Sequence, residues 1–177
     1  MTYVSEPLHD HHVLDVFDSG KPELDLWLRN SARHAQRNRT CSVTVWHDCD
    51  DVVLGYYGLV AHVVQREDLT PKVGRGSLDQ IPAVLLARLA LDRRIQGSGL
   101  GGILLADAFA KILEASGNVG VRLVVVDAID DQAAKFYEKH GFTPTPVEGR
   151  LVRKVSDIAA DFERAADTET EQVDGPL

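Results

Sequence analysis

The stretch Arg94-Ile95-Gln96-Gly97-Ser98-Gly99-Leu100-Gly101-Gly102 lies between an apolar run and an amphipathic segment. The run from Ala83 to Asp92 has the composition of a central strand, and apolar residues then recur at helical spacing up to Gly117. Glycines let a backbone approach an anion closely, and the free N–H groups at the start of a helix point toward it. The stretch therefore predicts a loop that binds a pyrophosphate.

Two other interpretations of this loop stay open. Gly97, Gly99 and Gly102 also satisfy G-x-G-x-x-G, a fingerprint of nicotinamide-dinucleotide binding, but residues 92–96 separate the strand from the first glycine. The loop can also be a glycine-rich helix start that binds nothing. Ordering four glycines within six residues costs conformational entropy, which argues for a ligand.

The rest of the chain alternates helical and strand-like segments around this loop. The patterns predict a helix over 22–38, strands over 42–46 and 52–60 in a hairpin, a polar loop over 66–80, a strand over 83–92, a helix from Leu100, a strand over 121–128, a helix through Lys139 and a strand over 151–155. Asp130 or Asp131 is suited to cap the helix through Lys139, and Gly141 is suited to end it. This order predicts an α+β fold with a mixed sheet rather than a series of βαβ units.

The composition is that of one globular domain: 177 residues, 44% hydrophobic and 26% charged. No basic segment followed by an apolar run opens the chain, and no stretch approaches about 18 consecutive apolar residues. We therefore expect a cytoplasmic protein with no membrane partner. Its two cysteines, Cys41 and Cys49, are expected to be reduced.

The net charge of −8 is unevenly distributed. Residues 156–177 contain seven acidic residues against Arg164 alone, a balance of −6 that leaves −2 for residues 1–155. A short helix over 157–166 is expected there, followed by a disordered segment from Thr168. The chain is therefore expected to consist of a domain over 1–155 and a partly disordered acidic extension over 156–177.

Two motifs together resemble one enzyme family. The pattern Arg94-x-x-Gly97-x-Gly99 is similar to the acetyl-CoA pyrophosphate loop of the GNAT N-acetyltransferases, Q/R-x-x-G-x-G/A. The segment from Asp130 to Phe142 is similar to the second GNAT signature, N-x-x-A-x-x-F/L-Y-x-x-x-G-F, with Asp130 in place of the asparagine. The resemblance implies a GNAT-like, mostly antiparallel central sheet flanked by helices.

The resemblance extends to the toxin branch of this family, the TacT-like proteins, over residues 14–155. It rests on Phe17-Asp18-Ser19-Gly20, Leu24, Trp27-Leu28, Gly55-Tyr56-Tyr57, Ile81-Pro82 and Leu86 to Asp92. Ser19 stands where the branch usually has cysteine. The branch implies acetylation of the α-amine of aminoacyl-tRNA, which inhibits translation, and a cognate ribbon–helix–helix antitoxin. A homodimer is also compatible with it.

The resemblance implies direct acetyl transfer from acetyl-CoA as cosubstrate, with no metal, and Tyr137 as the general acid that protonates the departing thiolate. A purely structural tyrosine is the alternative. The residues implied in acetyl-CoA binding lie on the strand end, the loop and the second motif: Leu89, Ala90, Leu91, Arg94, Gln96, Gly97, Ser98, Gly99, Leu100, Gly101, Gly102, Asp130 and Phe136.

The type of acceptor is inferred from the lack of an obvious general base. No histidine or glutamate is obviously placed as a general base, and an α-amine with a pKa of about 7.7–8.0 keeps a useful neutral fraction at pH 7, unlike lysine at about 10.4. An α-amino acceptor therefore fits better. A GNAT enzyme of a small amine or a protein, and a non-catalytic CoA-binding module, are the alternatives.

Arg29, Arg33 and Arg37 recur at i, i+4 and i+8 opposite the apolar face of the first predicted helix. No acidic residue occurs from Leu26 to Trp46, so the pattern predicts an exposed basic ridge. It is interpreted as a phosphate-backbone track for tRNA, extended by Arg39, Lys72 and Arg75. A merely solvated helix face is the alternative.

Three histidines, His9, His11 and His12, lie close to the N-terminus. Because no further ligands follow at a regular spacing, the sequence predicts a mobile N-terminus rather than a metal site.

Overall fold

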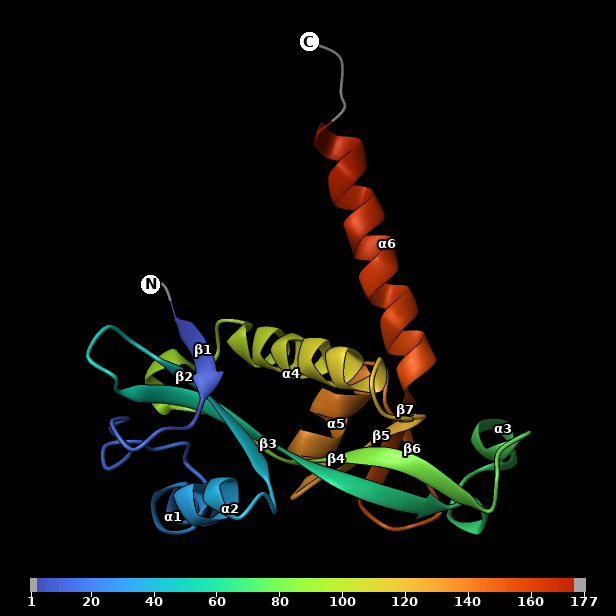
Figure 1. Ribbon diagram of the computed structural model, residues 1–177, viewed down its shortest axis with the longest axis horizontal. Coiled ribbons are helices and arrows are strands. Elements are labelled where there is room, and N and C mark those ends of the chain that lie inside the picture. The colour runs from blue at the N-terminus through green and yellow to red at the C-terminus, as the bar shows by residue number, and fades with distance from the viewer. Residues whose placement is uncertain (1–2, 174–177) are drawn as a thin grey trace. The chain divides into compact units, whose positions relative to one another are not determined.

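The computed structural model describes residues 3–173 (Figure 1). Its elements are β1 (Val4–Pro7), α1 (Pro22–Asn30), α2 (Ala32–Arg37), β2 (Ser42–His47), β3 (Val53–Gln65), α3 (Pro71–Gly74), β4 (Gln80–Leu91), α4 (Leu100–Ser116), β5 (Leu123–Asp127), α5 (Asp131–Lys139), β6 (Thr143–Pro144), β7 (Arg150–Lys154) and α6 (Val155–Val173). Two short 3-10 turns, Arg66–Asp68 and Arg93–Ile95, precede α3 and the glycine loop.

The strands form a seven-stranded sheet in the order β1-β2-β3-β4-β5-β7-β6. The pairs β1/β2, β2/β3, β5/β7 and β6/β7 are antiparallel. The predicted α+β fold with a mostly antiparallel sheet is confirmed. By its contacts the chain divides into two compact units, which we call unit 1 (residues up to 62 with 84–108) and unit 2 (63–83 with 109 onward).

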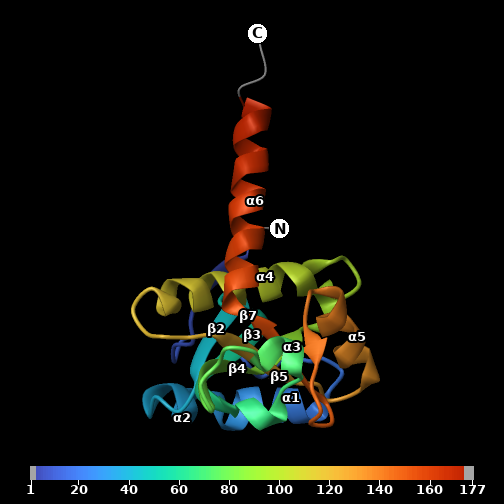
Figure 2. The ribbon, with the colours of Figure 1, turned by 90° about the vertical axis from the view of Figure 1, so that its right-hand side faces the viewer.

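In unit 1, helices lie on both faces of the β2–β3 hairpin (Figure 2). Neighbouring tyrosines of β3 reach opposite faces because strand side chains alternate. The hydroxyl of Tyr56 donates to the Leu24 carbonyl of α1 at 2.8 Å, and that of Tyr57 donates to Asp107 of α4 at 2.9 Å. Both rings are fully buried, so the hairpin forms the centre of this unit.

The predicted helix over 22–38 is two helices, α1 and α2, which meet at Ser31. Ser31 leaves the helical region at φ −126°, while its N–H still donates to the Trp27 carbonyl at 2.9 Å. The apolar spacing continues across the break, and Leu28 and Ala32 both lie in the core of unit 1. Neither glycine nor proline marks the break, so periodicity could not locate it.

In unit 2, α5 has the caps that the sequence predicts. The Asp130 side chain accepts from the N–H of Ala133 at 2.8 Å, and Gly141 ends the helix at φ +86°. The left-handed φ favours glycine at this position, and a Cβ there would also lie 2.8 Å from Nε of Arg153, so the arginine side chain would have to shift. The neighbouring strand β5 is buried from Leu123 to Val126.

The C-terminal helix α6 is longer than the predicted 157–166. It is helical up to Val173, so the disorder predicted from Thr168 is wrong as far as that residue, and 174–177 lie outside the described residues. Low apolar content does not exclude a solvated helix rich in alanine and glutamate, which are strong helix formers. The first turns are anchored by Ile158, which is fully buried, and by an ion pair between Arg153 and Asp161.

The prediction of a mobile N-terminus is also wrong for the described residues. Strand β1 pairs with β2 from Val4 to Pro7, and both Leu8 and His12 are buried. Cys41 and Cys49 are free thiols, as expected. Within residues 3–173 we find no helix with the length and apolar character needed to cross a bilayer.

Candidate active site

The glycine loop connects β4 to α4 within unit 1, and two of its glycines have a left-handed backbone conformation that is strained for other residues. Gly97 and Gly99 have φ of +79° and +80°, in the left-handed region. A Cβ at either position would meet no atom within 4 Å, so the backbone conformation, not packing, requires glycine. Helix α4 begins directly after them at Leu100, where its first N–H groups have no partner within the helix.

Asp92 holds the start of this loop. Its carboxylate is almost completely buried and accepts from the Arg94 guanidinium at 2.7 and 2.9 Å, from the Arg94 N–H at 2.9 Å and from the Asp18 N–H at 3.1 Å. Burial acts to raise the pKa of Asp92, but these hydrogen bonds hold it below its ordinary value. An ionised, fully engaged carboxylate therefore anchors the loop. Sequence reasoning included Asp92 only as the end of a strand.

Two side chains predicted to bind the cofactor also brace the loop. The amide of Gln96 donates to the carbonyls of Ser19 at 2.9 Å and Leu91 at 2.7 Å. The guanidinium of Arg94 is paired with Asp92, although about half of its side chain stays exposed. The Gln96 side chain is thus committed within the protein, whereas Arg94 keeps a face toward solvent.

The other loop residues predicted to bind the cofactor offer mainly main-chain groups to a ligand. The Ser98 hydroxyl donates to the Ile95 carbonyl at 3.1 Å, and the N–H of Gly102 donates to the Gly99 carbonyl at 3.2 Å. Leu100 and Gly101 are half-buried in the first turn of α4. An anion at this turn would be met by main-chain N–H groups and the positive end of the helix dipole.

The end of β4 leads into the loop. Leu89 is half-buried, while Ala90 and Leu91 are buried. The strand is held against β3, where a Cβ at Gly55 would lie only 2.9 Å from the Leu91 side chain. This close approach explains a glycine inside a buried strand.

Tyr137 belongs to unit 2, on α5, and is 8% exposed. Its ring meets Phe136 and Phe142 edge-on, with centroids 5.2 and 5.3 Å away. Burial raises the pKa of the Tyr137 phenol well above its ordinary value. The hydroxyl therefore keeps its proton at neutral pH.

The predicted basic ridge is only partly exposed, which corrects the sequence-based expectation. Arg29 donates to the Phe17 carbonyl at 2.9 Å, and Arg33 donates to the His12 carbonyl at 2.6 Å. The Arg33 side chain is 32% exposed, whereas that of Arg37 is 64% exposed. Both approach Asp10, at 3.9 and 3.6 Å, so an acid from outside the helices compensates their charge.

Arg39, Lys72 and Arg75 are exposed, as a phosphate-binding role would require. Arg39 follows α2 in unit 1 with φ of +57°, whereas Lys72 and Arg75 lie in and after α3 in unit 2. Their role in RNA binding stays a prediction, as do the catalytic role of Tyr137 and the cofactor contacts.

Comparison with known proteins agrees with this geometry. Residues 40–144 match the family described as acetyltransferase (GNAT) domain. The chain is 39% identical over 134 residues to the tRNA-acetylating toxin of Mycobacterium tuberculosis, an alignment that covers 75% of this chain and 79% of that protein.

Two solved structures are similar over most of both chains. AtaT complexed with acetyl-methionyl-tRNAfMet is 30% identical with a TM-score of 0.84, covering 91% of this chain and 99% of that one. A mutant AtaT toxin bound to the C-terminus of the antitoxin AtaR and acetyl-CoA is 30% identical with a TM-score of 0.77, covering 90% and 98%. With its glycine loop, its buried tyrosine and these relatives, the chain belongs to the GNAT acetyltransferase family.

Proposed function

We propose that this protein is a toxin that transfers the acetyl group of acetyl-CoA to the α-amine of aminoacyl-tRNA and thereby inhibits translation. The observation that carries the proposal is the loop with left-handed Gly97 and Gly99 at the start of α4, in a chain aligned over three quarters of its length with a tRNA-acetylating toxin. An acetylated α-amine is no longer a nucleophile for peptide-bond formation.

In the proposed reaction the loop and the end of β4 hold the donor. N–H groups around Leu100 and Gly101 bind the pyrophosphate of acetyl-CoA, and the strand end at Leu89 to Leu91 pairs with its pantetheine arm. An N–H group of that strand polarises the thioester carbonyl. The remaining predicted contacts, from Arg94, Gln96, Gly97, Ser98, Gly99, Gly102, Asp130 and Phe136, belong to the same proposal.

The acetyl group passes directly from sulfur to nitrogen. The neutral α-amine attacks the thioester carbon, a C–N bond forms and the C–S bond breaks. Tyr137 gives its proton to the departing thiolate, the amine releases its surplus proton to solvent, and Tyr137 takes a proton back from solvent before the next cycle. Burial keeps the Tyr137 phenol protonated and raises its pKa, so proton transfer has to be coupled to departure of the thiolate.

A tRNA acceptor requires cationic groups that are free to meet phosphates. Arg37 and Arg39 on unit 1, and Lys72 and Arg75 on unit 2, are exposed and support this part of the proposal. Arg29 and Arg33 contribute charge, but their hydrogen bonds to main-chain carbonyls give them a structural role as well.

The proposal also includes partners, compartment and domain organisation. The AtaT toxin has been seen with the antitoxin AtaR, and we propose a ribbon–helix–helix antitoxin for this protein, with a homodimer as a possible assembly. Its substrate places the activity in the cytoplasm, where charged tRNA is used. Residues 1–155 are proposed as the catalytic domain, and 156–177 as an acidic extension outside it.

The test is incubation of the protein with total charged tRNA and labelled acetyl-CoA. We expect label on the amino acid, recovered after the aminoacyl ester is hydrolysed, and at least a tenfold loss of this activity in Tyr137→Phe. Tyr57→Phe is the matched control, because it also removes the hydroxyl of a buried tyrosine, and Tyr57 is not among the residues proposed to bind acetyl-CoA or to donate the proton.

Parallel reactions contain a polyamine or a lysine peptide in place of tRNA. Label on either of these and never on aminoacyl-tRNA would support the alternative, a GNAT enzyme of small amines or proteins, and would reject the toxin proposal. Binding of acetyl-CoA without label on any acceptor would support a non-catalytic CoA-binding module.

A further inference from the structure

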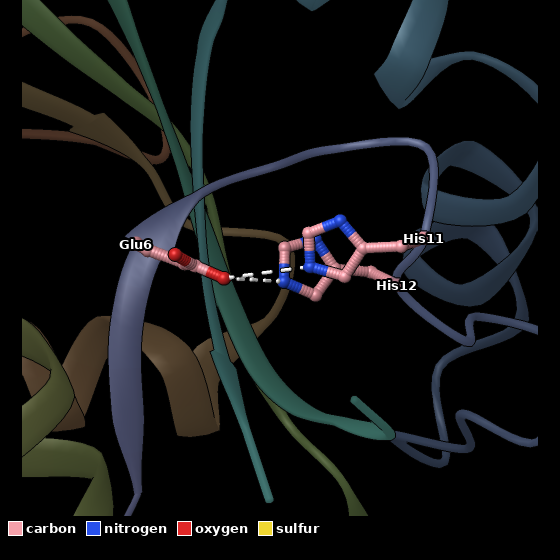
Figure 3. Close-up of side chains that lie close together, drawn as sticks. All are labelled: Glu6, His11 and His12. Atoms are coloured by element: carbon pink, nitrogen blue, oxygen red, sulfur yellow. Dashed lines mark hydrogen bonds and ion pairs between the residues drawn. The ribbon is translucent and has the colours of Figure 1, made fainter. Parts of the chain in front are cut away.

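A cluster of metal-ligating side chains lies in unit 1 outside the glycine loop. Glu6 of β1 and His11 and His12 of the following segment bring a carboxylate oxygen and two imidazole nitrogens within 4.8 Å of one another (Figure 3). Nε2 of His12 lies 3.0 Å from Oε1 of Glu6, and Nε2 of His11 lies 3.6 Å from the same oxygen. Neither the donor loop nor the proposed proton donor uses these residues.

These separations fit the ligand spacing of a small divalent cation. A tetrahedral zinc ion with bonds of about 2.0–2.2 Å places its ligands about 3.3–3.6 Å apart. Of the two Glu6 distances, one lies just below this range and the other at its upper end. Two imidazoles with one carboxylate form a set of borderline donors that favours zinc, nickel and cobalt over magnesium or calcium.

The burial of the cluster is graded. The His12 side chain is fully buried, that of Glu6 is about one third exposed, and that of His11 is about half exposed. A cation bound here would be enclosed on the His12 side and accessible beside His11. Three protein ligands with one open position for water make up a complete tetrahedral set.

Two further groups surround the cluster. The Nε2 atom of His47 lies 3.1 Å from Oε1 of Glu6, and its Nδ1 faces the Asp48 carbonyl at 2.8 Å. Oδ1 of Asp51 lies 3.9 Å from Nε2 of His11. A second carboxylate beside the site contributes the charge that balances a dication, and His47 orients the Glu6 carboxylate.

His12 must change its tautomer to bind through Nε2. Its Nδ1 accepts the N–H of His9 at 2.9 Å, so the single ring proton lies on Nε2 and points at Glu6. When a cation replaces that proton, the ring carries it on Nδ1 and the His9 N–H turns away. His9 is exposed, so its N–H can be satisfied by water.

We propose that Glu6, His11 and His12 form a three-ligand site for a divalent cation of the zinc, nickel and cobalt class. The cation ties the edge strand β1 to the segment before α1. That segment continues into Val13, whose N–H donates to the Asp51 carbonyl at 2.9 Å, and the His12 carbonyl accepts from Arg33. Occupancy of the site therefore stabilises the segment against which Arg33 is held.

The experiment uses the full chain without a histidine tag, stripped with a chelator and titrated with zinc chloride in a calorimeter. We expect one ion per chain with a micromolar or tighter Kd, and a rise in Tm of about 5–10 °C at a hundredfold excess over Kd. Cobalt in place of zinc should give the visible absorption bands of a tetrahedral site.

His11→Gln removes the most exposed ligand with little effect on folding, and should weaken zinc binding at least tenfold. His34→Gln, an exposed histidine of α2, is the matched control and should bind zinc like the unmodified chain. Equal zinc affinity in His11→Gln and the unmodified chain would overturn the proposal, as would failure of zinc, nickel and cobalt to bind. Activity on tRNA is not part of this test.

Discussion

The glycine loop and the basic ridge of α1 and α2, formed by Arg29, Arg33 and Arg37 and called the arginine row below, were both apparent as sequence patterns. In the structure their functional groups differ. In the loop, the groups proposed to bind the pyrophosphate are main-chain N–H groups, and the buried carboxylate of Asp92 holds the start of the loop in place. In the row, the functional groups are side chains, and two of the three donate to main-chain carbonyls of the N-terminal segment. A backbone motif keeps its predicted function in the folded protein because that function depends on local conformation. Side chains of a sequence motif can instead form hydrogen bonds with distant residues, which changes their role.

The largest effect is expected in the loop. Gly99→Val places a β-branched residue at φ +80°, where non-glycine residues cost about 1–2 kcal/mol or more. We expect kcat/KM for acetyl-CoA to fall about 30-fold or more, measured with a fixed aminoacyl-tRNA acceptor. The loss should appear also in the Kd of acetyl-CoA, since the loop is proposed to bind its pyrophosphate.

Gly76→Val is the matched control for that change. Gly76 also has a left-handed φ, +71°, and a Cβ there would also meet no atom within 4 Å, but it lies after α3 in unit 2. It should share the cost in folding stability and leave acetyl-CoA affinity unchanged. Equal loss of affinity in both variants would show that general destabilisation, not the loop, is responsible.

An intermediate effect is expected at Arg33. Arg33→Ala removes a charged donor from the His12 carbonyl, whose bond is 2.6 Å long, in a half-buried position. We expect the free energy of unfolding to fall by about 1.5–3 kcal/mol, measured by urea denaturation. An unchanged unfolding midpoint would mean that the arginine row is a solvated surface after all.

The smallest effect on stability is expected at Arg37. Its side chain is 64% exposed and its ion pair with the exposed Asp10 spans 3.6 Å, so Arg37→Ala should change the unfolding free energy by about 0–1 kcal/mol. If Arg37 meets a phosphate, the slope of log affinity for tRNA against log salt should decrease by about 0.7–0.9. Salt-dependent binding curves that superimpose on those of the unmodified chain would remove Arg37 from the RNA surface.

Several features were predictable because they depend on a few adjacent residues. Asp130 and Gly141 bound α5 as the capping pattern predicts, and the glycines of the loop precede α4 as expected. Features that depend on distant residues were not predictable. The amide of Gln96 meets the Ser19 carbonyl, 77 residues away, and the break at Ser31 has no local signal.

From the sequence alone, periodicity, caps and glycine positions predicted the main helices and strands, the glycine loop and the GNAT family, because these signals act over a few residues. They did not predict β1, α3 and β6, nor the division of the first helix into α1 and α2. Only the tertiary structure decided which charged and titratable groups are available. The pairing of buried Asp92 with half-exposed Arg94, the half-buried position of Arg33 and the gathering of Glu6 with His11 and His12 depend on packing between segments. The glycine loop can be identified from the sequence because its functional groups are backbone N–H groups, whose placement depends on local conformation. The role of a side chain depends on the residues that pack against it in the folded protein.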